Sequence, residues 1–199
     1  MGIEWSIGWK VVLSAWLAVA AALDLKTRRV PHWIAWPLLL GAVVVRAWEG
    51  AWTLPVLLVG LALVEVASGG WQLPVAALLV GLVAAASGGA ARFTALWWGA
   101  LYALRVLHVL GGADMRIFMA LVALFPDGRM VAALWGGLAL VSTAWLLVQY
   151  RRHALVPLAQ AGQGLLAGRY PSQEALSSQG RPTTPGLALG ALVYLWLIT

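Results

Sequence analysis

Residues 52–70 read WTLPVLLVGLALVEVASGG, and residues 71–89 read WQLPVAALLVGLVAAASGG. At an offset of 19, ten of the 19 positions are identical, including the Trp, the Leu-Pro pair and the closing Ser-Gly-Gly. Each copy is too uniformly apolar for a barrel strand, in which apolar and polar residues alternate. We therefore expect two apolar helices in a hairpin that arose by tandem duplication. Chance similarity between helices rich in Leu, Val and Ala is the simpler alternative.

Apolar runs of this kind extend along nearly the whole chain. Hydrophobic residues make up 62% of the 199 residues and charged residues 10%, against roughly 45–50% and about 25% in soluble domains. The 13 Trp and 22 Gly suit helices in a bilayer. We predict an all-α fold, a polytopic transmembrane bundle of about eight helices in one integral-membrane domain (1–199), with 52–89 as an inserted hairpin. The stretches lie near 7–24, 33–48, 53–67, 73–87, 93–110, 114–126, 130–150 and 185–199.

The basic residues predict the orientation of this bundle. If the N-terminus is outside and all stretches cross, nine Lys and Arg residues lie inside and four outside, as the positive-inside rule favours. The inner nine are Lys26, Arg28, Arg29, Arg105, Arg116, Arg151, Arg152, Arg169 and Arg181; the outer four are Lys10, Arg46, Arg92 and Arg129. Both termini are then outside, and the long polar stretch 151–184 is a cytoplasmic loop. The net charge of +6 carries topology information and predicts no nucleic-acid partner.

Three acidic residues adjoin the apolar helices, where an ionised group costs ~2.5–3.5 kcal/mol at the bilayer centre. Asp24 ends the first stretch, and Asp114 begins another after Gly111 and Gly112. Four crossings separate these two, so both are expected at the cytoplasmic face. Glu65, whose counterpart in the second copy is Ala84, is expected to be a structural or interfacial acid in a hairpin peripheral to the site.

Two carboxylates at one depth suggest an acid–base pair, and if they approach to ~3 Å, one proton is shared between them. The ionised partner can activate a water, and the protonated partner can polarise an amide carbonyl. Gly111 and Gly112 would let an extended substrate backbone approach, and Pro31 would stiffen the loop after Asp24. Simpler alternatives are that Asp24 caps a turn or pairs with a nearby basic residue, and that Asp114 caps its helix.

No metal or cofactor is expected. The three His residues lack the HxxH and HExxH spacings of metal sites, and the absence of Cys excludes disulfides, Cys-based zinc modules and thiol nucleophiles.

Three segments resemble the type IV prepilin peptidases, which belong to the GxGD group of membrane aspartyl proteases. The family pattern D-x-x-x-x-x-I-P-N is similar to Asp24, LKTRR and then Val30-Pro31-His32. The pattern G-x-G-D-x-K-L is similar to residues 111–117, GGADMRI, and a closing P-F-G-P-F-L-A-L-G-A to residues 182–191, PTTPGLALGA. The chain departs from these patterns at Ala113, Arg116 and His32.

The resemblance implies a membrane aspartic endopeptidase with Asp24 and Asp114 as its catalytic pair. It implies that Gly111, Gly112, Ala113, Arg116 and Pro31 surround the substrate. The substrates would be pilin-like precursors, cut after a basic leader at the cytoplasmic face of a bacterial-type inner membrane. The absence of Cys favours the short form without the Cys-containing methyltransferase region.

Two other functions fit the same residues. One is a transporter or channel with the carboxylates as a proton relay, and the other is a non-catalytic assembly subunit descended from the peptidase. The oligomeric state is not determined by the sequence.

Overall fold

The computed structural model describes residues 7–27, 30–67, 69–107, 109–150 and 183–198. These residues form eight α-helices and no strand, which confirms the all-α prediction, and each helix lies within a few residues of an expected stretch. The helices are α1 (Ile7–Thr27), α2 (His32–Trp48), α3 (Thr53–Val66), α4 (Gln72–Ala86), α5 (Gly89–Val106), α6 (Gly112–Leu124), α7 (Gly128–Tyr150) and α10 (Thr184–Val193). A π-helical turn, η2 (Tyr194–Ile198), continues α10.

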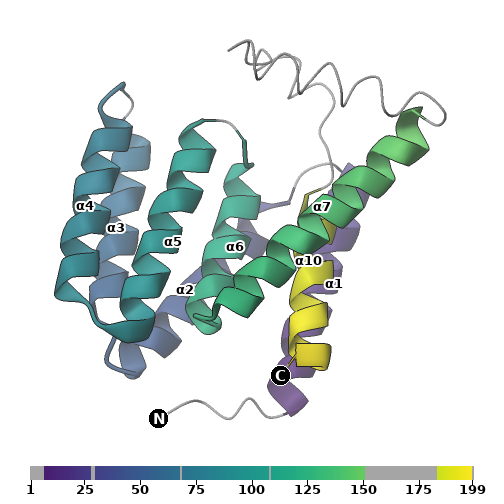
Figure 1. Cartoon of the computed structure of the whole chain (residues 1–199), viewed down its shortest axis with the longest axis horizontal. Coiled ribbons are helices and arrows are strands. Elements are labelled where there is room, and N and C mark those ends of the chain that lie inside the picture. Colours follow the sequence, from purple (N-terminus) through teal and green to yellow (C-terminus); the bar gives the residue numbers. More distant parts are fainter. Residues whose placement is uncertain (1–6, 28–29, 68, 108, 151–182, 199) are drawn as a thin grey trace.

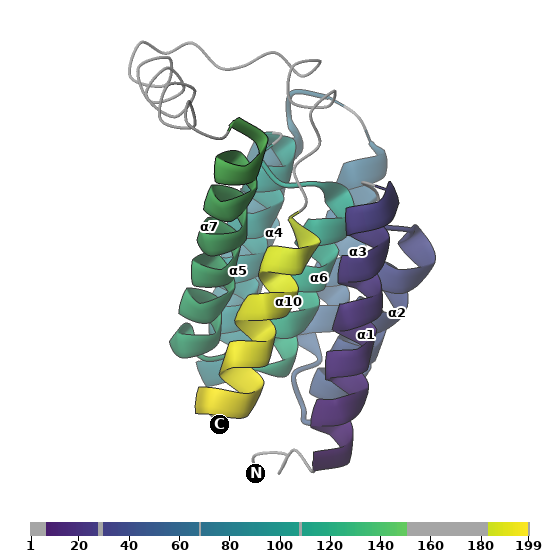
Figure 2. The same cartoon turned by 90° about the vertical axis from the view of Figure 1, so that its right-hand side faces the viewer.

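Successive helices run in opposite directions, so their ends gather at two ends of the bundle (Figures 1 and 2). Helices α3, α4, α5 and α6 stand side by side, while α7, α10 and α1 form the other flank (Figure 1). Helix α10 packs against α7 and α1, and α2 packs against α6. We call one end of the bundle the site end; it contains the C-terminal ends of α1, α3 and α5 and the N-terminal ends of α2, α6 and α10.

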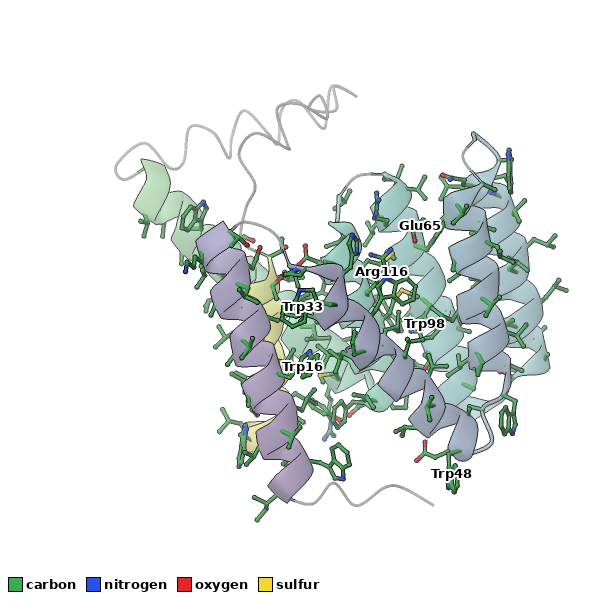
Figure 3. The ribbon with its side chains drawn as sticks, turned by 180° about the vertical axis from the view of Figure 1, so that it is seen from behind. Trp16, Trp33, Trp48, Glu65, Trp98 and Arg116 are labelled. Atoms are coloured by element: carbon green, nitrogen blue, oxygen red, sulfur yellow. The ribbon has the colours of Figure 1, made fainter. Side chains whose placement is uncertain are left out.

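Helix α6 forms the centre of the bundle. All of residues 115–123 are buried, because α2, α5, α7 and α10 each contact this helix. A helix that is apolar on every side must lie inside a protein or a membrane. The indole Nε1 of Trp98 in α5 donates a hydrogen bond of 2.9 Å to the carbonyl oxygen of Met119, and Figure 3 shows this ring within the bundle. The core thus fixes the position of α6, at whose start Asp114 lies.

The outward faces of the bundle are strongly apolar. Exposed side chains include Trp48 at 90%, Val66 at 84% and Leu197 at 79%, and Figure 3 shows Trp48 at the end opposite the site end. Among the described helices, α1 alone has the length and hydropathy of a full membrane span, with a mean hydropathy of 1.5. This helix supports a membrane location. The segments α2, α3, α4 and 184–198 are apolar but shorter.

The two sequence copies correspond to α3 and α4, which form a helical hairpin. Trp52 and Trp71 are the N-cap residues of these helices, and a Pro is the third residue of each. The side-chain amide of Gln72 donates to the carbonyl oxygens of Val64 and Ala67, which closes the turn between the helices. Residues 151–182 of the loop expected at 151–184 lie outside the described residues. Thr183 is the N-cap of α10, and Thr184 is its first residue.

Candidate functional site: two carboxylates at one threonine

Asp24 is the last member of an apolar stripe on α1. The buried residues of this helix are Leu13, Leu17, Ala20 and Asp24, whose spacing of three or four places them on one helix face. Asp24 therefore points into the bundle and is only 5% exposed. Its Oδ2 accepts a hydrogen bond of 3.1 Å from the backbone N–H of Thr184.

Asp114 is the third residue of α6, in the first turn, where the helix dipole favours negative charge. The N-cap of this helix is Gly111, and no side chain caps it. The alternative that Asp114 is itself the cap is therefore wrong. Its Oδ1 accepts a hydrogen bond of 2.7 Å from the hydroxyl of Thr184.

Thr184 thus joins two carboxylates that lie 90 residues apart in the sequence. It is the first residue of α10, where a backbone N–H has no acceptor within the helix, and its side chain is fully buried. The sequence patterns did not place this residue in the site. The available signal was a pair of Thr residues between Pro182 and Pro185, directly before an apolar run, which is typical of a helix start.

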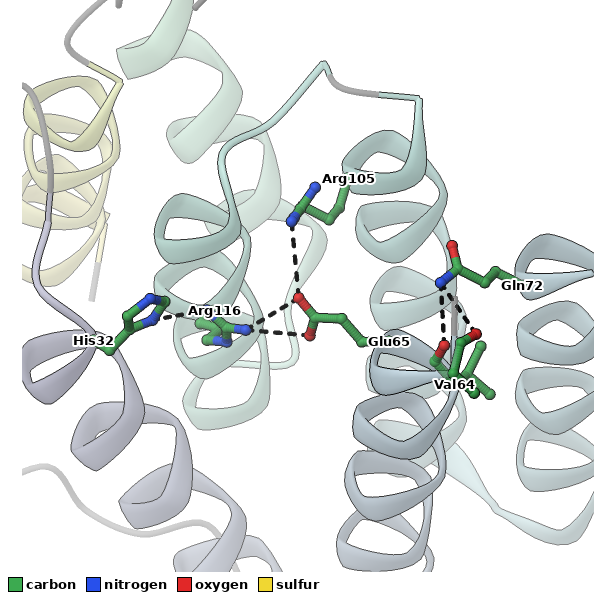
Figure 4. Close-up of polar contacts among 7 residues, drawn as sticks. His32, Val64, Glu65, Gln72, Arg105 and Arg116 are labelled. Atoms are coloured by element: carbon green, nitrogen blue, oxygen red, sulfur yellow. Dashed lines mark hydrogen bonds and ion pairs between the residues drawn. The ribbon is translucent and has the colours of Figure 1, made fainter. Parts of the chain in front are cut away.

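Arg116 is the centre of a second polar cluster at the same end (Figure 4). Its Nη2 donates to both carboxylate oxygens of Glu65, at 3.2 and 3.1 Å, and Arg105 lies 3.9 Å from the same carboxylate. Its Nη1 lies 3.3 Å from Nδ1 of His32, and its guanidinium lies 4.8 Å from the ring centre of Trp36. Because a guanidinium only donates, Nδ1 of His32 is the acceptor in this contact.

This cluster links parts of the sequence that were expected to be separate. Glu65 belongs to the hairpin, which we expected to be peripheral, yet it pairs with Arg116 two residues from Asp114. Packing of α3 at the site end explains this difference, which spacing alone does not reveal. His32 and Arg116, two of the three departures from the family patterns, contact each other.

The small residues of the site border the carboxylate and the arginines. A Cβ added at Gly111 would lie 2.7 Å from Oδ2 of Asp114, and one at Gly112 would lie 3.2 Å from Nε of Arg105. The side of each glycine on which a Cβ would lie is thus bordered by these polar groups. Ala113 is half-buried beside them. Pro31 is the N-cap of α2, and its carbonyl accepts the N–H of Ile34 at 3.0 Å.

The arrangement can perform acid–base chemistry. Two carboxylates share one buried donor residue, and two guanidinium groups lie near the same helix start. In the described ranges, no three His, Asp or Glu side chains gather as a metal site would require. Arg28, Arg29 and His108 lie outside the described residues.

An apolar groove of about 370 Å³ lies between α1 and α2, away from the two carboxylates. Its lining includes Trp9, Trp16 and Pro37.

Comparisons of the chain with models of protein families, with curated proteins and with solved structures found no match.

Proposed function

We propose that this chain is a membrane aspartic endopeptidase of the prepilin-peptidase type. The supporting observation is the convergence of its three family-like segments. Asp24, Asp114 and Thr184, one from each segment, are joined by two hydrogen bonds. Neither of those bonds was required by the sequence patterns that carry the resemblance.

The proposed location is a bilayer crossed by several helices, with the site end facing the cytoplasm. Its support is the exposed apolar surface, which soluble monomers rarely show in large patches. Helices of 14–17 residues such as α2 and α3 rise only about 21–26 Å, less than the ~30 Å hydrocarbon core. Flanking Trp side chains or local thinning of the bilayer would accommodate such short helices.

The proposed reaction is hydrolysis of a peptide bond after the basic leader of a pilin-like precursor. One ionised Asp takes a proton from a water as the water attacks the scissile carbonyl, and the other, protonated Asp donates to the developing oxyanion. The leader is basic, so it would be repelled by Arg105 and Arg116 and would lie away from that cluster. The scissile segment must be extended, since a helix occupies its carbonyls in hydrogen bonds.

Co-expression with a pilin precursor that carries a class III signal tests this function by the mass of the product. Wild type should remove the leader, and Asp24→Asn and Asp114→Asn should each abolish cleavage. Asp127→Asn is the matched control, because Asp127 lies at the opposite end and bonds Tyr194 and the N–H of Arg129. A chelator should not lower cleavage. If a membrane-inserted Asp24→Asn or Asp114→Asn variant still cleaves the precursor, the aspartyl mechanism is wrong. If the wild-type protein produces no mass shift, the peptidase function is wrong.

A further inference from the structure

Thr184 donates two hydrogen bonds of different chemical character to the two carboxylates. The donor to Asp24 is a backbone N–H, at 3.1 Å, and the donor to Asp114 is a hydroxyl, at 2.7 Å. A backbone N–H can only donate, whereas a hydroxyl can either donate or accept. Thr184 therefore offers each carboxylate a different kind of hydrogen-bonding group.

Both donors come from a rigid element. The N–H groups of Gly186 and Leu187 bond the carbonyl of Thr183, which fixes the first turn of α10. Pro185 has no backbone N–H, and its ring restricts φ, which limits the motion of this turn. The side chain of Thr184 is β-branched and 0% exposed, so few rotamers are open to it.

We propose that Thr184 is a positioning residue that assigns the two carboxylates different roles, an inference that rests on the proposed peptidase function. The backbone N–H favours the ionised form of Asp24, which makes Asp24 the base. The hydroxyl donates to ionised Asp114 and accepts from protonated Asp114, so Asp114 can hold the proton that it donates to the substrate and regain it later. No additional reactant is needed, since the proton moves only between water, the two carboxylates and the peptide.

The test compares Thr184→Val, which removes the hydroxyl and keeps the N–H, with Thr184→Ser, which keeps both. Thr184→Val should lower kcat on the order of tenfold to a hundredfold with KM nearly unchanged, because the misplaced acid affects the chemical step. Thr184→Ser should restore most of kcat. Thr94→Val is the matched control, since Thr94 is equally buried but bonds Ala90 within its own helix.

The pH profile separates positioning from a merely structural role. Removing a donor to ionised Asp114 should move the alkaline limb of kcat to higher pH by about one unit and leave the acid limb, assigned to Asp24, unchanged. The other charged and titratable groups at this end are the same in wild type and variant; they include Asp24 on α1, His32 on α2, Glu65 on α3, Arg105 on α5 and Arg116 on α6. The assignment is overturned if the acid limb moves instead, if Thr184→Val retains full kcat, or if Thr184→Ser is as slow as Thr184→Val.

A second measurement keeps this inference distinct from the peptidase function. In a double-mutant cycle of Thr184→Val and Asp114→Asn, thermal unfolding in detergent should show non-additive changes. If wild type cleaves no precursor, the proposed function fails and the catalytic roles fail with it, whereas non-additivity still establishes the Thr184–Asp114 bond. Additive changes overturn the positioning role even in an active enzyme.

Discussion

Arg116 and Asp24 are the two charged side chains buried in the described part of the bundle, at 7% and 5% exposed. A buried charge requires a partner, since an uncompensated one costs several kcal/mol. Arg116 obtains its partner from Glu65, on a helix that begins 59 residues earlier in the sequence than α6 does. The ion pair therefore connects α3 with the first turns of α6, and Asp114 lies in the first of these turns.

We predict that Glu65→Gln lowers both stability and cleavage. The amide retains some hydrogen bonding to Arg116 but removes the charge that faces two guanidinium groups. The free energy of unfolding should fall on the order of 1–2 kcal/mol, less than for a fully buried pair, because the Glu65 side chain is 29% exposed. Thermal unfolding in detergent and precursor cleavage measure the two effects.

The matched control is Glu49→Gln, which removes a carboxylate that pairs with Arg46 at the opposite end of the bundle. This pair lies at the C-terminal end of α2, and it does not join separate helices. Cleavage should therefore be unchanged in Glu49→Gln. Equal cleavage by Glu65→Gln and wild type would show that the Glu65–Arg116 pair does not help to place Asp114.

That Asp24 and Asp114 lie at the same end of the bundle could be predicted from the sequence. A charged group in an apolar helix is energetically unfavourable, so the few acidic residues next to such helices were easy to identify. The partner that these two residues share could not be predicted. Thr184 is neutral, and its role depends on the packing of α10 between α1 and α7, which no local pattern encodes. The pairing of Glu65 with Arg116 was missed for the same reason, although a lone acid in an apolar helix was a signal that a partner exists.

At the scale of the helices, the apolar runs predicted nearly every boundary. Helix α5 was an exception: it covers Gly89–Val106, whereas the expected stretch was 93–110. Arg92 lies in the first turn, where its Nε donates to the carbonyls of Ala84 and Ser87 at the end of α4. A charged side chain that donates to the free carbonyl groups at the end of the preceding helix thus looks like a loop residue in the sequence.

The crossing of α7 and α10 decides where Thr184 lies. A Cβ added at Gly137 would lie 2.6 Å from the backbone N of Gly190, and one at Gly186 would lie 2.7 Å from Cα of Leu138. These distances are below any van der Waals contact, and backbone atoms cannot rotate away as a side chain can. Glycine is required here so that the two helix backbones can approach closely, as small residues allow in membrane bundles.

We predict opposite effects for alanine at two neighbouring positions of α7. Gly137→Ala should separate the helices and cost about 1–3 kcal/mol of stability, with loss of cleavage as Thr184 shifts. Gly136→Ala should be neutral or stabilise by up to about 1 kcal/mol, since no atom lies within 4 Å of its added Cβ and Ala favours helix. Thermal unfolding in detergent measures both. Equal stabilities of the two variants would contradict the close crossing.

At the scale of the whole molecule, the eight described helices form an up-and-down bundle, and α1 begins at the same end at which η2 finishes (Figure 2). Both described termini therefore lie opposite the site end. The basic segments before α2 and before α10 each connect two helix ends at the site end, and they contain six of the nine Lys and Arg residues expected inside. The orientation depends on these segments, because the described helices divide their basic residues almost equally between the ends.

We predict that the site end faces the cytoplasm. Green fluorescent protein inserted after residue 70, in the α3–α4 turn, or within 155–180 should fluoresce. Alkaline phosphatase inserted at the same places should be inactive. Reporters after residue 88, in the α4–α5 turn, should behave in the opposite way, because α4 then crosses the bilayer between them. The reverse pattern at both turns would contradict the orientation and would move Asp24 and Asp114 away from a cytoplasmic precursor. The same behaviour at residues 70 and 88 would show that α4 does not cross, and the bundle would then be associated with the membrane by fewer helices than eight.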